Sequence, residues 1–128
     1  MASADELTAI FREATEALVV HLRQLVSNKW PEAMVQANVT NRPGQHGTTL
    51  SVLHRQDGDG IELQLELSSI DDVTWVEATL FLGQSTLVTL SSQCWSPASS
   101  RPEELRRTIE DFATFLQPRF LQLVRLQA

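Results

Sequence analysis

At Ile61–Leu67 the chain reads Ile-Glu-Leu-Gln-Leu-Glu-Leu. Apolar and polar residues alternate without a break, and successive side chains of a β-strand point to opposite faces of a sheet. The pattern predicts a strand with one buried face and one wet face, and the wet face carries Glu62, Gln64 and Glu66. The rest of the chain can be placed by asking what covers the apolar face and what meets the acidic one.

Two amphipathic segments lie outside this central region. Residues 5–28 have a capping box at Ser3 and Glu6, and the Trp30-Pro31 pair ends the segment. Apolar residues recur there at steps of three and four, which is the spacing of one helix face. They are Leu7, Ile10, Phe11, Ala14, Ala17, Leu18, Leu22, Leu25 and Val26.

A second helix is predicted to begin at residues 100–103, where Ser-Arg-Pro-Glu combines a capping box with an early proline. Its apolar face is predicted to hold Leu105, Ile109, Phe112 and Leu116. Pro118 is expected to kink or break this helix, because proline lacks an amide hydrogen and its ring clashes with the preceding turn. Beyond it, Phe120, Leu123 and Val124 continue in phase.

Four further strands are predicted between the helices, at residues 33–40, 48–55, 73–82 and 85–92. Residues 41–47 and 93–99 are predicted loops, residues 57–60 and 68–72 are predicted turns, and Gly83-Gln84 is a two-residue hairpin. Short connections favour an antiparallel meander. The whole chain, residues 1–128, is therefore predicted to be one α+β domain, a two-layer sandwich of a five-stranded sheet with both helices on one face.

The strand at residues 73–82 is apolar on both faces, so its orientation has to be argued. One alternate set, Val76, Ala78, Leu80 and Leu82, has no polar member. The other set includes Glu77 and Thr79, whose polar atoms are costly to bury without partners. We therefore expect Trp75, Glu77 and Phe81 to lie on the wet face. In the alternative, Trp75 and Phe81 point inward and the charges only keep the protein soluble.

Composition and charge narrow the classes of function. The chain has 128 residues, 42% of them hydrophobic, and a net charge of −6. Residues 30–100 hold eight acidic residues and two arginines, which argues against nucleic-acid binding. No apolar run is long enough to span a membrane, and no signal peptide is recognised, so a cytoplasmic location is expected.

Residues that could carry catalysis or hold a metal are few. His21, His46 and His54 match no helix-borne zinc motif, although His46 and His54 could meet if the 41–47 loop folded over the neighbouring strand. Cys94 is the single cysteine and is expected to be structural. Nucleotide-binding and hydrolase motifs are missing, so we expect no cofactor, no metal and no enzymatic activity.

Acidic residues do not form a recognised site either. Asp57-Gly58-Asp59-Gly60 begins like a calcium loop, but the position of the bidentate acid is Ser68, and a hairpin turn is the simpler interpretation. Glu62 and Glu66 are about 13 Å apart on one strand, too far for a glycosidase pair.

An exposed sheet face that mixes acids and aromatics is typical of a recognition surface. The predicted partner-binding residues are Glu62, Gln64, Glu66, Trp75, Glu77 and Phe81. Small acidic α+β chains without motifs include bacterial immunity proteins, which neutralise toxins, and secretion chaperones. The leading hypothesis is an immunity-like inhibitor that docks on a basic protein partner. A dimeric chaperone or adaptor is the first alternative, and a small enzyme or ligand carrier with a helix–sheet pocket is the second.

Overall fold

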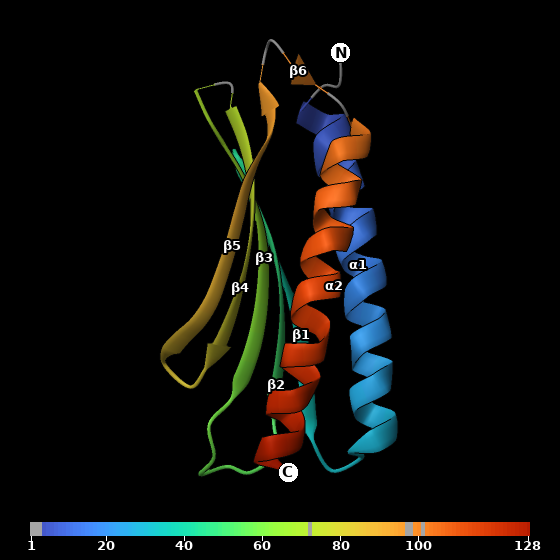
Figure 1. The fold of residues 1–128 in the computed structure, drawn as a ribbon, viewed down its shortest axis with the longest axis vertical. Helices are drawn as coiled ribbons and strands as arrows, with labels where there is room; N and C mark the ends of the chain where they lie inside the picture. The colour runs from blue at the N-terminus through green and yellow to red at the C-terminus, as the bar shows by residue number, and fades with distance from the viewer. Residues whose placement is uncertain (1–3, 72, 97–98, 101) are drawn as a thin grey trace.

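The computed structural model describes residues 4–71, 73–96, 99–100 and 102–128. Helix α1 (Ala4–Lys29) is followed by strands β1 (Met34–Arg42), β2 (Gln45–Leu53), β3 (Ile61–Ile70), β4 (Val73–Leu82) and β5 (Ser85–Ser96), a short β6 (Ser99–Ser100) and helix α2 (Pro102–Gln127). Both helices lie side by side over one face of the sheet and leave the other face uncovered (Figure 1). The predicted two-layer α+β sandwich is confirmed; only β6 was not expected.

The sheet is a simple antiparallel meander, with the strands in chain order from β1 to β6. Leu82 pairs with Ser85 across the Gly83-Gln84 hairpin, and Gly83 has a positive φ of 59°. Glycine reaches this conformation without steric cost, so the predicted position of the hairpin is confirmed.

The predicted loops are shorter in the structure. Strands β1 and β2 continue to Arg42 and resume at Gln45, so the loop predicted at residues 41–47 is wrong except at Pro43 and Gly44. The His46 Nδ1 and Asn41 Oδ1 atoms lie 3.0 Å apart across the paired strands, and Gly44 takes a φ of 72° in the turn. A polar cross-strand pair thus extends the ladder into a segment whose composition suggested a loop. Likewise β5 runs on through residues 93–96, where a loop was predicted.

The core lies between the helices and the apolar face of β2, β3 and β4. Leu63 and Leu65 on β3 are each 1% exposed, which confirms the predicted burial of this face. Leu50 and Val52 on β2 are buried beside them. From α2 the core receives Leu105, Ile109, Leu116, Phe120 and Val124.

The face of α1 that meets the sheet differs from the predicted stripe. Thr15 and Val19 are buried, whereas Ala17, which was predicted on the apolar face, is exposed. The Thr15 hydroxyl donates to the backbone oxygen of Phe11 at 2.8 Å and lies 3.3 Å from the Thr48 hydroxyl. Because these bonds satisfy its polar atom, a threonine can occupy a position that a hydropathy pattern assigns to an apolar residue.

Helix α2 continues through Pro118, so the predicted break is wrong. The Arg119 guanidinium donates to the backbone oxygen of Phe115 at 2.7 Å and lies 3.6 Å from the centre of the Phe115 ring. A proline disturbs the hydrogen bonds of the turn that precedes it, and this side chain supplies a donor there. Phe120 and Val124 remain buried beyond the proline, as their spacing predicted.

Candidate protein-binding face

The sheet face that points away from the helices is called the open face below. Trp75 lies on it and is 39% exposed, while Val76 and Leu80 are buried on the opposite side of β4. The orientation predicted for this strand is therefore confirmed. The other predicted site residues on this face are exposed or half-buried: Glu62, Gln64, Glu66, Glu77 and Phe81.

Strand register decides which of these side chains are neighbours. Glu66 on β3 pairs directly with Glu77 on β4. Side chains at directly opposite positions have Cβ atoms about 4.5–5.5 Å apart, and like charges there are destabilising. Glu66 and Glu77 are called the carboxylate pair below. Glu62 pairs instead with Phe81, and Gln64 with Thr79, so the structure brings two of the three predicted acids together.

Neutral donors hold the carboxylate pair in place. The Gln45 amide and the Ser68 hydroxyl both donate to Glu66 Oε1, the hydroxyl at 3.1 Å. The Ser91 hydroxyl donates to Glu77 Oε1 at 3.4 Å. These donors orient the carboxylates and carry no positive charge themselves. The pair is therefore placed to accept a cation from outside the chain.

Trp75 stands next to the carboxylate pair. It precedes Glu77 by two residues on β4, about 7 Å along a strand, and pairs with Ser68 on β3 and Gln93 on β5. Ser68 is also a donor to Glu66, so the ring and the carboxylates share neighbours. A flat aromatic surface beside two acids suits a partner that presents lysine or arginine side chains, whose stems and charges both find contacts.

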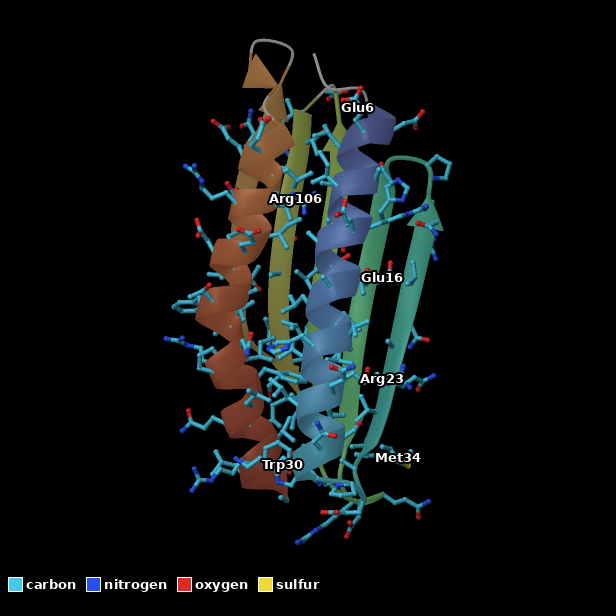
Figure 2. The ribbon with its side chains drawn as sticks, turned by 90° about the vertical axis from the view of Figure 1, so that its right-hand side faces the viewer. Glu6, Glu16, Arg23, Trp30, Met34 and Arg106 are labelled. Carbon is cyan, nitrogen blue, oxygen red and sulfur yellow. The ribbon has the colours of Figure 1, made fainter. Side chains whose placement is uncertain are left out.

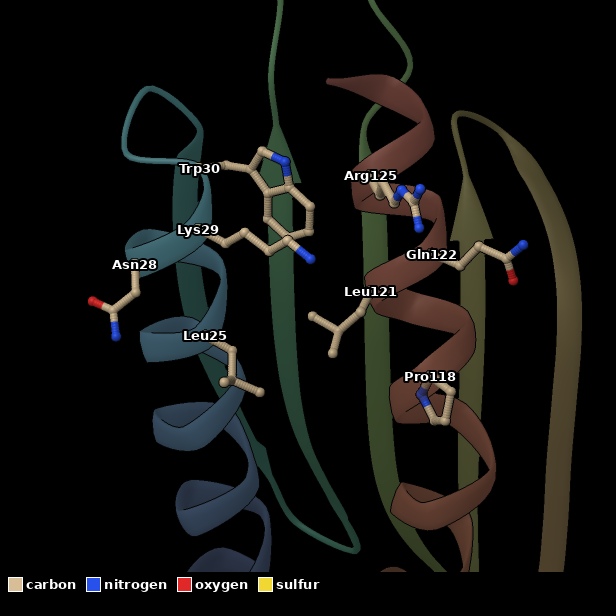
Figure 3. A pocket seen from close by; sticks show the side chains of 8 residues that line it. All are labelled: Leu25, Asn28, Lys29, Trp30, Pro118, Leu121, Gln122 and Arg125. Carbon is tan, nitrogen blue, oxygen red and sulfur yellow. The ribbon is translucent and has the colours of Figure 1, made fainter.

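A hollow of about 660 Å³ lies on the other side of the molecule, between the C-terminal halves of α1 and α2 (Figure 3). Leu25 and Leu121 line it, together with Trp30, Pro118 and the cations Lys29 and Arg125. Lys29 and Arg125 lie in the last turns of their helices, where positive charge complements the helix dipole. The residues that line this hollow include no carboxylate, thiol or imidazole.

The histidines are far apart. His46 lies near the start of β2 and His54 just beyond its end, about 26 Å away along an extended strand. His46 contacts Asn41, while the His54 ring meets Trp30 edge-on at 5.9 Å. The suggested meeting of the two histidines is therefore wrong. His21 is exposed in the middle of α1, and its side chain contacts that of Gln117 on α2.

Two further expectations concern metal and thiol chemistry. Among the residues that the structure describes, no cluster of three or more potential metal ligands occurs. Residues 57–60 form part of the connection between β2 and β3, and Gly58 donates its amide to the Arg55 oxygen at 3.0 Å, as in a turn. The side chain of Cys94 lies outside the described part of the chain.

Comparison with protein families, with curated proteins and with solved structures finds no match for this chain. Within the described ranges, neither helix combines the length and the apolar character that crossing a membrane requires.

Proposed function

We propose that this chain is a non-enzymatic protein-binding domain of the immunity or inhibitor kind, which docks its open face on a basic protein partner. The observation that carries the proposal is the carboxylate pair: two acids directly opposite each other on a face that no helix covers. A fold gains nothing from such a pair, since like charges at opposite positions repel. The arrangement is understandable if a cation of the partner sits between them.

Trp75 adds the apolar part of the interface. An exposed aromatic ring beside acids on a sheet face has the composition of a binding hot spot. Toxins that act on anionic substrates need basic surfaces, so an acidic face would attract them and cover the surface that they use. A cytoplasmic location fits a protein that protects its own cell in this way.

The test is a comparison of two baits. The wild-type chain and Trp75→Ala are immobilised at equal density and exposed to native lysate of the source cells. We expect the wild type to retain a basic protein that Trp75→Ala loses by at least about tenfold, because truncation of a hot spot commonly costs about 2 kcal/mol or more. Leu126→Ala is the matched control, since Leu126 is also an exposed apolar residue but lies at the end of α2.

Two outcomes would contradict the proposal. Equal retention by Trp75→Ala and by the wild type would show that the open face is not the docking surface. A tight dimer that Trp75→Ala dissociates would show that the open face meets a second copy, as the chaperone or adaptor alternative requires. Sedimentation velocity of both proteins separates the two cases.

A further inference from the structure

Strand β1 is an unprotected edge of the sheet. It pairs with β2 on one side over nine residues, in a continuous register. Natural sheets usually protect such an edge with proline, lysine or a bulge, because its free amide and carbonyl groups invite another strand. Residues 34–42 contain neither proline nor lysine. At the other side of the sheet, the pairing of β4 with β5 has two irregularities, and β6 covers one end of β5.

A groove runs beside this edge, between β1 and α1. It has a volume of about 400 Å³. One face of α1 forms one wall, with Arg12, Thr15, Glu16, Val19, Val20 and Arg23, and alternate residues of β1 form the other, with Ala37, Val39 and Asn41. In Figure 2, α1 lies beside the edge strand, and Glu16 and Arg23 are labelled on it. A strand added to β1 would therefore place every second side chain in this groove.

The groove suits apolar side chains in its middle. Val39 and Val20 stand at its two walls and are 64% and 48% exposed, so a guest would remove both from water. At its floor, the Thr15 and Thr48 hydroxyls are 3.3 Å apart, and Thr15 also donates to Phe11. Because these hydroxyls already have partners, an apolar guest leaves no new polar group unsatisfied.

The charged residues around the groove indicate which charges a bound segment should have at its ends. The groove is lined by Arg12 and Arg23 against one acid, Glu16, and Arg42 ends β1, although the whole chain has a net charge of −6. A second copy would meet this edge through the same patch, since a two-fold interface is self-complementary, and would bring its own arginines against these. An acidic segment from another protein is the complementary occupant.

We propose that the β1 edge and this groove bind an extended segment of a second protein by strand addition, with apolar residues at alternate positions flanked by acids. Main-chain hydrogen bonds to β1 supply affinity, and the groove selects alternate side chains. Arg12 and Arg23 are 11 residues apart, about 16 Å along the helix. Acids six residues apart on a strand span about 20 Å, which long arginine side chains can meet. This site is separate from the open face and does not depend on the function proposed for it.

The probe is the fluorescent peptide Glu-Thr-Val-Thr-Val-Thr-Glu, read by fluorescence anisotropy with the full chain. We expect saturable binding that weakens with salt, because charge–charge attraction between exposed groups is screened. The same peptide with both glutamates replaced by lysine should bind at least about tenfold more weakly, since like charges then face the groove. N-methylation of alternate residues removes their main-chain donors. It should abolish binding when the methylated amides are those that face β1.

Variants of the protein locate the site. Val39→Lys and Arg23→Glu should each weaken binding by about tenfold or more, through the strand and the helix wall respectively. Leu87→Lys is the matched control, since Leu87 is an exposed apolar residue on β5, and it should change binding by less than about twofold. Circular dichroism and thermal melts confirm that each variant folds.

Three results would overturn the proposal. They are failure of the wild type to bind the acidic peptide, equal effects of Val39→Lys and Leu87→Lys, and a wild-type dimer that Val39→Lys turns into a monomer. The last would assign the edge to a second copy. Trp75→Ala serves as an additional control. If this variant no longer retains the basic partner but still binds the peptide as tightly as the wild type, the groove site is separate from the open face.

Discussion

At the scale of single residues, the carboxylate pair is where the structure departs most clearly from what stability alone favours. Glu66 and Glu77 face each other across β3 and β4 with neutral donors around them. Functional surfaces commonly lower stability in this way, because groups suited to a partner are not suited to the free protein. The effect of the carboxylate pair on the stability of the free protein can be measured without knowing the partner.

Glu77→Gln should stabilise the free protein by about 0.2–1 kcal/mol at low salt, since it removes one of two like charges at directly opposite positions. The amide keeps the shape of the side chain and its contact with Ser91. Urea denaturation at low and high salt gives the measurement, and the gain should shrink as salt screens the repulsion. Glu62→Gln is the control, because Glu62 pairs with Phe81 and has no acid opposite. A stability loss in Glu77→Gln would mean that the pair is not repulsive.

The pairing itself was within reach of the sequence. Alternation placed both acids on the open face, but the turn predicted at residues 68–72 was too long to define a register. In the structure β3 continues to Ile70, which pairs with Val73, and Asp71 takes a φ of 52°. Aspartate tolerates this conformation better than most residues, so a two-residue turn could have been predicted. Counting back from such a turn pairs Glu66 with Glu77.

At the scale of elements, period and polarity predicted every helix and every long strand, and most errors lie at their ends. Strand ends depend on cross-strand pairs, such as Asn41 with His46, and these two residues pair only because the turn between them is confined to Pro43 and Gly44. Pro118 shows a related limit within a helix, since the burial of Phe120 and Val124 in the core beyond the proline is a tertiary contribution that favours a continuous helix. The groove beside β1 was missed because it needs the placement of α1 relative to the sheet edge.

Strand β3 offers the test of the core at this scale. Leu65 is 1% exposed between the helices and its strand neighbours. Leu65→Ala should lower the free energy of unfolding by about 2–5 kcal/mol, from the lost transfer of the side chain and the cavity that remains. Chemical denaturation gives the value. Leu87→Ala, at an exposed position, should change it by about 0.5 kcal/mol or less. A Leu65→Ala midpoint equal to that of the wild type would contradict the assignment of the buried face.

At the scale of the whole molecule, both helices bury one face of the sheet and the other stays free (Figure 1). The layers themselves follow from the sequence, because two one-sided helices and a one-sided sheet have few ways to bury their apolar surfaces. The binding partner of the free face cannot be deduced from the fold, since an exposed surface contributes little to the choice of fold. For this reason the fold could be predicted closely, while the proposed function rests on the electrostatics of that face.

Long-range electrostatics makes the last prediction. Glu62, Glu66 and Glu77 share the open face, and a basic partner approaching it should be attracted before contact. Reversing all three to lysine should slow association with the basic protein retained by the wild type by about tenfold or more, and should remove the salt dependence of its association rate. The dissociation rate should change less than the association rate, because steering acts mainly before contact. Stopped-flow or surface-based kinetics across a salt series gives both rates.

The matched control is the triple reversal of Glu32, Glu110 and Asp111, which are exposed residues outside the open face. It changes the net charge by the same amount, so a general charge effect would slow both variants equally. If the acids of the open face steer the partner, the association rate should fall for the reversal of Glu62, Glu66 and Glu77 and change little for the control variant. The reason is that screened interactions fade within about 10 Å at moderate ionic strength. Equal association rates for the two variants would show that the acids of the open face do not steer the partner.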